Sequence, residues 1–220
     1  MLEGLAERLS EKTALIYEAD GEKRTMSFAG LYSAVTGRAR ELKNSGKTSV
    51  GVLCDGSIGC VLTIFGANLA GMQTVLLDPA ISVETLSRMI DYTDVDMLFG
   101  DAELCSRLEG SLTGGVKDGR GKLLFFTSGT TEAAKAVVLT DESLCNSAYN
   151  GSVMLPLSED DVLLSMLPLC HVFGFVCSLL WGLSCGAAVA LGRGMRHWLD
   201  DWSFFRPTAV SVVPAMLGFF

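Results

Sequence analysis

The stretch Leu123–Thr140, LLFFTSGTTEAAKAVVLT, decides the fold of this chain. It opens with an apolar run, Leu123–Phe126, and ends with a β-branched run, Ala136–Thr140, and both runs predict strands. Between them lie Lys135 and a loop that contains Thr127, Ser128, Gly129, Thr130 and Thr131. Such a loop offers backbone N–H groups, hydroxyl donors and an ammonium group, which suits a polyphosphate. An ordinary hairpin turn rich in Ser, Thr and Gly is the alternative interpretation.

The order of residues in this loop excludes a Walker P-loop. That motif needs a second glycine before the lysine and a hydroxyl after it. Here Ala134 precedes Lys135 and Ala136 follows it. The predicted element after the lysine is also a strand, whereas a P-loop leads into a helix.

The same loop resembles the phosphate-loop signature [ST]-S-G-[ST]-[ST]-G-x-P-K-G-V of the adenylate-forming (ANL) superfamily. Acyl-CoA synthetases, luciferases and the adenylation domains of peptide synthetases belong to that superfamily. The matching residues are Thr127, Ser128, Gly129, Thr130, Thr131, Lys135 and Val137. Glu132, Ala134 and Ala136 replace its two glycines and its proline. We expect Glu132 to point outward or to pair with a cation.

Three further segments resemble motifs of the superfamily in the right order. Thr25–Leu31 resembles the first core motif, Asn68–Pro79 the second, and Pro207–Leu217 the segment before the nucleobase-binding region. Between the last two, Pro168–Gly174 matches the motif P-[LM]-x-H-x-x-G and contains His171.

The resemblance assigns roles to residues of the histidine-containing motif, Pro168–Gly174. In relatives its histidine borders the acyl-substrate pocket and adjusts between the half-reactions. We therefore expect His171 to be a catalytic residue and His171, Phe173 and Gly174 to bind the substrate. The phosphate-loop residues Thr127, Ser128, Gly129, Thr130, Thr131 and Lys135 are expected to bind the nucleotide. A lone histidine in an apolar segment can also be an ordinary core residue.

The alternation of strands and helices predicts an α/β fold with a mostly parallel sheet, or sheets, flanked by helices on both faces. Helices are expected at Leu2–Leu9, Phe28–Lys43, Ile58–Ala70, Val83–Tyr92, Ala102–Leu108, Phe173–Leu183 and Trp198–Phe205, and a further helix is expected to begin with Asp141 and Glu142. Strands are expected at Thr13–Tyr17, Lys23–Met26, Thr48–Cys54, Thr74–Leu77, Met97–Phe99, Leu123–Phe126, Ala136–Thr140, Val162–Leu167, Ala187–Leu191 and Thr208–Val213.

By resemblance, residues 1–220 are the N-terminal portion of an AMP-binding (adenylation) domain. We divide them into a first αβ subregion, 1–109, a flexible glycine-rich connector, 110–122, and a phosphate-loop and acyl-pocket subregion, 123–220. Relatives are more than twice as long. The C-terminal half and the lid domain are therefore expected to be absent, the isolated chain to be inactive, and the surface exposed by truncation to allow dimerisation.

The resemblance implies a two-step reaction. A carboxylic acid, fatty or otherwise apolar, attacks the α-phosphate of ATP with Mg²⁺ present, and the acyl group then passes to coenzyme A or to a carrier-protein pantetheine. An acyl carrier protein is a further expected partner. A non-catalytic binding or assembly module that keeps the fold is one alternative. A membrane-embedded protein that uses the uncharged stretches Gly56–Leu77 and Val162–Gly192 is another.

Composition excludes several other classes. The net charge of −8 argues against a nucleic-acid partner. The seven cysteines lack CxxC spacing and lie mostly in apolar runs, which predicts buried free thiols of a reducing cytoplasm. With only two histidines, His171 and His197, no metal site is predicted. The charged N-terminal segment lacks the apolar core of a signal peptide.

Overall fold

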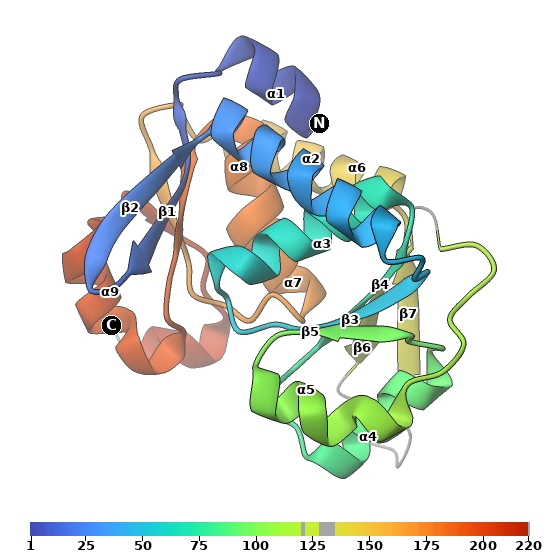
Figure 1. Ribbon diagram of the computed structural model, residues 1–220. Coiled ribbons are helices and arrows are strands. Elements are labelled where there is room, and N and C mark those ends of the chain that lie inside the picture. Colours follow the sequence, from blue (N-terminus) through green and yellow to red (C-terminus); the bar gives the residue numbers. More distant parts are fainter. Residues whose placement is uncertain (120–121, 128–134, 220) are drawn as a thin grey trace. The chain divides into compact units, whose positions relative to one another are not determined.

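The residues that the structure describes form two sheets of five strands each, and their ribbon is drawn in Figure 1. The computed structural model describes residues 1–119, 122–127 and 135–219. Residues 1–32, 144–168 and 172–220 form one compact unit, and residues 33–143 with 169–171 form a second. The division into subregions 1–109 and 123–220 stays a prediction from the sequence.

The sheet of the first unit has the strand order β10-β8-β9-β1-β2. Its strands are β1 (Thr13–Ala19), β2 (Glu22–Ser27), β8 (Val162–Ser165), β9 (Ala188–Leu191) and β10 (Ala209–Val210). The hairpin β1–β2 turns at Asp20-Gly21, where both residues have positive φ, as a two-residue hairpin turn requires. Strand β1 pairs in parallel with β9, so the hairpin adds to strands from the end of the chain.

The sheet of the second unit has the order β5-β3-β4-β6-β7. Its strands are β3 (Ser49–Leu53), β4 (Gln73–Leu77), β5 (Met97–Phe99), β6 (Leu123–Thr127) and β7 (Lys135–Leu139). All residues of β3 and β4 are buried, as expected for parallel strands covered on both faces. Among the described strand pairs of this sheet, only β6–β7 is antiparallel. The predicted mostly parallel α/β fold is confirmed.

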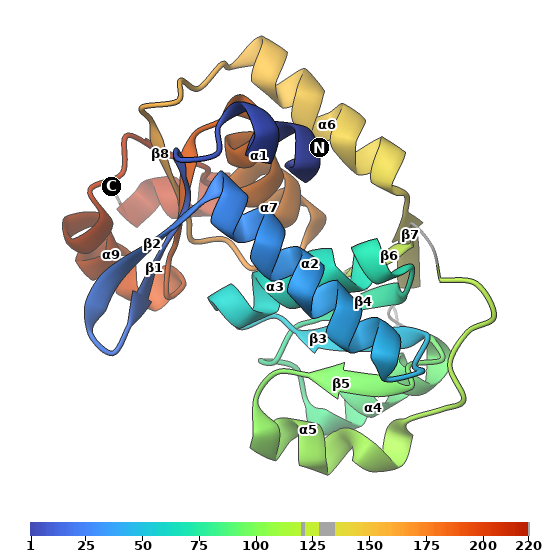
Figure 2. The same ribbon diagram turned by 45° about the horizontal axis from the view of Figure 1, so that its top comes forward.

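Helices cover both faces of this second sheet. Helices α2 (Phe28–Asn44) and α3 (Ile58–Ala70) lie on one face, and α4 (Val83–Tyr92) and α5 (Ala102–Leu108) on the other (Figures 1 and 2). Side chains of α4 and α5 form one core with Leu53, Val75 and Leu77 of the strands. Ser57, Ser82 and Asp101 each cap a helix by accepting a hydrogen bond from a backbone N–H.

Helices also pack on both faces of the sheet of the first unit. Helix α9 (Trp198–Phe205) packs on Ile16 and Leu164, whereas α8 (Trp181–Cys185) lies against Leu163 and Val189. Helices α1 (Leu2–Arg8), α6 (Asp141–Met154) and α7 (Val172–Phe175) complete the α-helices of the described residues.

Two predicted elements differ from the structure by more than one or two residues at their ends. The strand expected at Thr208–Val213 is only Ala209–Val210, because no more of it pairs with β8 before Pro214 begins a 3₁₀ turn. The helix expected at Phe173–Leu183 is interrupted by a π-helical segment, Val176–Leu180, between α7 and α8. Among the described residues, no helix is both long and apolar enough to span a membrane.

Candidate functional site

The predicted phosphate loop lies in the sequence between two paired strands, β6 and β7. Phe125 pairs with Val137, Phe126 with Ala136, and Thr127 with Lys135. Strand β6 also pairs with β4, which anchors the hairpin in the sheet. The predicted strand–loop–lysine–strand layout is therefore confirmed at its two described ends.

Thr127 and Lys135 stand at the two ends of the loop, and both are exposed. Because Lys135 is the first residue of a paired strand, its backbone is held in place while its exposed ammonium group extends into solvent. This arrangement suits an anionic ligand. Ser128, Gly129, Thr130, Thr131 and Glu132 lie outside the described residues, so their predicted roles stay predictions.

The residues of the predicted acyl-pocket motif fall in both units. His171 is exposed and belongs to the second unit, whereas Phe173 and Gly174 belong to the first. The Phe173 side chain is 46% exposed. A Cβ on Gly174 would collide with the carbonyl oxygen of Pro168, so close packing already accounts for this glycine.

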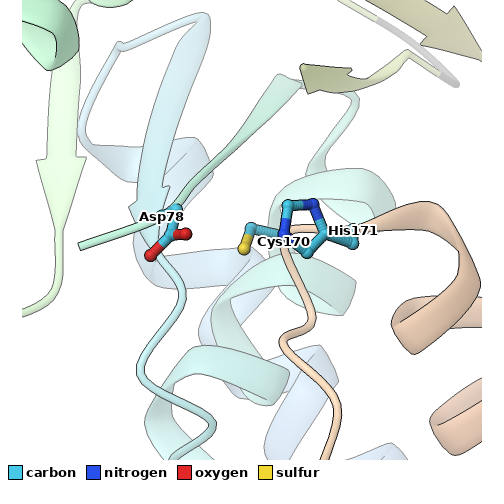
Figure 3. A group of neighbouring side chains, drawn as sticks. All are labelled: Asp78, Cys170 and His171. Atoms are coloured by element: carbon cyan, nitrogen blue, oxygen red, sulfur yellow. The ribbon is translucent and has the colours of Figure 1, made fainter. Parts of the chain in front are cut away.

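The structure brings together three polar side chains that no sequence motif links. Asp78 directly follows β4, and Cys170 and His171 lie in the loop before α7 (Figure 3). One potential ligand atom from each lies within 4.8 Å of the other two. Asp78 and the histidine motif each stood out in the sequence, but no sequence pattern indicated that they meet.

The thiol of Cys170 is buried beside this carboxylate. Burial is the main cause that raises the pKa of Cys170 to about 12, and the negative charge of Asp78 contributes next. The group is therefore a neutral thiol at pH 7 when no cation is bound.

Two more thiols lie near Cys170. Cys54 follows β3, and its backbone N–H donates to the carbonyl oxygen of Leu77 at 2.8 Å, which places it next to Asp78 across the two strands. Its hydrogen bond with Cys60 and its burial hold the pKa of Cys54 well above the usual range, and Cys170 adds to this shift.

The expectation of buried thiols is right for only part of the set. Cys54, Cys60 and Cys170 are buried, whereas Cys145 is exposed on α6, and Cys105, Cys177 and Cys185 are partly exposed. For Cys145 the prediction is wrong, because α6 turns this residue to solvent. All seven are free thiols, as predicted.

Comparison with known proteins gives a family match along nearly the whole chain. Residues 2–123 and 120–220 match the family described as AMP-binding enzyme. An oxalate–CoA ligase of Arabidopsis thaliana is 44% identical over 100 residues, which are 44% of this chain and 20% of that protein. A 2-succinylbenzoate–CoA ligase of Geobacillus sp. (strain WCH70) is 24% identical over 233 residues, 95% of this chain and 46% of that protein.

Solved structures show the same fold. The O-succinylbenzoate coenzyme A synthetase MenE of Bacillus subtilis, in complex with ATP and magnesium ion, superposes with a TM-score of 0.84 at 23% identity. The match covers 99% of this chain and 64% of that one. ATP-bound MatB of Rhodopseudomonas palustris superposes with a TM-score of 0.83 at 18% identity, over 99% of this chain and 50% of that one.

These matches cover only part of each relative: 20% and 46% of the two ligases, and 64% of the MenE chain. The family match nonetheless extends over residues 2–220, and the fold of the described residues agrees with that of MenE. The resemblance to adenylate-forming enzymes is confirmed, and the chain belongs to the AMP-binding enzyme family.

Proposed function

We propose that the whole protein is an acid–CoA ligase that activates a carboxylic acid with ATP. The observation that carries the proposal is the β6–β7 hairpin, which holds Thr127 and Lys135 at the two ends of a hydroxyl-rich loop. The family match and the CoA ligases among the relatives support it. The proposed products of the first step are an acyl-adenylate and pyrophosphate.

In this proposal the residues of the hairpin bind the leaving phosphates. The carboxylate attacks the α-phosphorus, and the bond to the bridging oxygen of pyrophosphate breaks. Negative charge then grows on the pyrophosphate oxygens, where the ammonium of Lys135 and the hydroxyl of Thr127 offset it. Ser128, Gly129, Thr130 and Thr131 are proposed to bind the same phosphates.

The charge and exposure of the described hairpin fit a nucleoside triphosphate, because its lysine is exposed on a paired strand. Mg²⁺, when bound, would neutralise part of the phosphate charge. We assign no residue of this chain as its ligand. His171, Phe173 and Gly174 are proposed to border the acid, with His171 in direct contact during the reaction.

The acid itself is proposed to be apolar, of the fatty or aryl kind. Long-chain acyl-CoA synthetase 7 of Arabidopsis thaliana and a 4-coumarate–CoA ligase of Narcissus pseudonarcissus are among the relatives, alongside the oxalate ligase. The second step is proposed to transfer the acyl group to the thiol of coenzyme A, or to a carrier-protein pantetheine. We also propose a cytoplasmic location, where ATP and coenzyme A are present.

Acid-dependent exchange between pyrophosphate and ATP in the whole protein tests the first step. We expect Lys135→Ala to lower the exchange rate by about 10²–10³-fold, because it removes a charge that acts on the leaving group. Lys117→Ala is the matched control, since Lys117 is an exposed lysine outside the hairpin. Exchange that is equally fast in Lys135→Ala and the control would refute the phosphate-binding role.

The acid and the acceptor thiol need separate assays. A panel of short, long-chain, aryl and dicarboxylic acids, each at equal concentration, would rank the acids by kcat/KM for exchange. Coenzyme A and a pantetheinylated carrier protein would then compete for the acyl group. A preference for a short dicarboxylic acid would overturn the apolar substrate class and leave the ligase chemistry intact.

A further inference from the structure

We propose that Asp78, Cys170 and His171 form a binding site for a borderline-soft divalent cation of the Zn²⁺ type. All three belong to the second compact unit, so their arrangement is defined within one body. Their potential ligand atoms, a carboxylate oxygen, a thiol sulfur and an imidazole nitrogen, lie within 4.8 Å of one another (Figure 3).

The donor set selects the kind of cation. One sulfur, one nitrogen and one oxygen ligand match Zn²⁺, which binds Cys, His and carboxylate side chains in tetrahedral sites. Mg²⁺ prefers oxygen ligands alone and keeps several waters. This site would therefore discriminate against the magnesium ion that accompanies a nucleotide.

The geometry is close to that of an occupied site. Zn²⁺ bonds of about 2.0–2.3 Å place tetrahedral ligand atoms about 3.5 Å apart. Atoms that lie within 4.8 Å of one another must therefore approach by at most about 1.3 Å, which side-chain rotation supplies. His171 is exposed and, within the part of the chain that the structure describes, its imidazole has no hydrogen bond or ion pair, so it is able to rotate.

The surroundings stabilise the other two ligands. Asp78 accepts a hydrogen bond from the backbone N–H of Ala80 at 2.9 Å, which orients the carboxylate as a supporting contact orients a metal ligand. Cys170 is buried, so its sulfur is fixed by packing. Three protein ligands leave a fourth position for water or a solute, on the side where His171 meets solvent.

Binding is a simple exchange of ions. The cation forms a bond to the sulfur of Cys170, the S–H bond breaks, and the proton passes to solvent. Neither an oxidant nor a reductant takes part.

Co²⁺ spectroscopy of this chain tests the site, because Co²⁺ reports a thiolate bond directly by its charge-transfer absorption. We expect one equivalent of Co²⁺ to give this band in the presence of excess Mg²⁺, and one equivalent of Zn²⁺ to remove it. Cys170→Ser should abolish the band. His171→Gln and Asp78→Asn should each weaken Co²⁺ binding by at least about tenfold, since even supporting contacts cost this much.

Matched variants distinguish this site from others. Cys145→Ser and His197→Ala change an exposed cysteine and the second histidine of the chain, and both should bind Co²⁺ as the unmodified chain does. His171→Gln alters an exposed residue and should fold normally, so it keeps the test valid if Cys170→Ser does not fold. Absence of the band, or a band that survives Cys170→Ser and disappears in Cys54→Ser, would overturn the proposal.

A consequence for catalysis rests on the proposed function. If His171 borders the acid, Zn²⁺ at this site should inhibit acid-dependent exchange, and His171→Gln should remove the inhibition. If Zn²⁺ does not inhibit the exchange although the Co²⁺ band is normal, the result would count against the role of His171 in the ligase and not against the metal site.

Discussion

The two sheets have the same number of strands but are assembled from the chain in different ways. The second sheet, β5-β3-β4-β6-β7, comes from one continuous stretch, Ser49–Leu139. The first, β10-β8-β9-β1-β2, joins Thr13–Ser27 to strands that begin at Val162. A local βα pattern can specify the former, whereas the latter depends on a pairing between the two ends of the chain.

Their antiparallel edges also differ. Edge strand β2 carries Glu22, Lys23 and Arg24, all exposed, and charge on an edge opposes pairing with another chain. Edge strand β7 instead exposes Val137 and Val138, which are 39% and 52% exposed. One edge is therefore protected by its sequence, and the other presents apolar side chains.

The largest expected effect comes from a charge placed in the core of either sheet. Leu15 in β1 and Val75 in β4 are both fully buried. Leu15→Asp should destabilise the first unit by at least about 4 kcal/mol, because it buries an unpaired carboxylate. Hydrogen exchange should then show lost protection in β8 and β9 and retained protection in β3 and β4.

Val75→Asp provides the reciprocal experiment and should release β3, β4 and β6 first. If either substitution removes protection from both sheets together, the two units unfold as one cooperative body. The difference in how the two sheets are built from the chain would then not correspond to any difference in their stability.

The fold of the second unit could be predicted from the sequence more completely than that of the first. In the second unit, helix bounds at Ile58–Ala70, Val83–Tyr92 and Ala102–Leu108 agree with the sequence prediction, because Ser57, Ser82 and Asp101 cap these helices. In the first unit, the pairing of β1 with β9 has no local signal, and neither has the π-helical segment Val176–Leu180.

A smaller effect is expected from alanine at glycines of the two units. A Cβ on Gly182 would lie 2.8 Å from Val189 and 2.9 Å from Leu163, so Gly182→Ala should destabilise the first unit by about 1–3 kcal/mol. Gly37, within α2, has open space around it, and Gly37→Ala should stabilise the chain by about 0.5–1 kcal/mol. Urea unfolding measures both, and equal effects would contradict the close packing of α8 on its sheet.

A pH-dependent effect is expected from Asp161 in the first unit. Hydrogen bonds from Ser158 N–H, from the Thr208 hydroxyl and from the Ser158 hydroxyl lower the pKa of this carboxyl group. A lowered folded-state pKa stabilises the protein above the unfolded value of about 4, and the gain is lost as pH falls through the folded value. The destabilisation by Asp161→Asn should therefore be larger at pH 7 than at pH 3.

Thermal unfolding at the two pH values measures this difference. Asp160→Asn is the control, because Asp160 is a neighbouring carboxylate that is mostly exposed. A destabilisation by Asp161→Asn that does not change with pH would show that the carboxylate charge contributes nothing at this turn.

A substitution on the apolar edge strand β7 is expected to have the smallest effect on stability. It should nonetheless change self-association measurably. Val138→Lys should lower self-association of the chain at high concentration, because a charge on β7 opposes strand pairing. Thr25→Lys on β2 is the control, since that edge already carries charge. Sedimentation velocity measures both, and an unmodified chain that stays monomeric would remove the basis for dimerisation through this edge.

The candidate site could be predicted only where its signal is local. The order of residues from Thr127 to Lys135 indicated the loop, and the structure confirms the hairpin at its two ends. The meeting of Asp78 with Cys170 and His171 depends on how a loop after β8 returns to the end of β4, which no local pattern encodes.

The pairing of β1 with β9 has a consequence for the order of protein synthesis. The ribosome produces the β1–β2 hairpin before β9, and at roughly 5–20 residues per second it takes roughly 10–30 s to continue from Ser27 to Ala188. A two-stranded hairpin alone is at best marginally stable. During this interval Leu15 and Ile16 lack their partners on β9 while the sheet of Ser49–Leu139 is already complete in sequence. Strand β1 thus leaves the ribosome well before its parallel partner β9 has been synthesised.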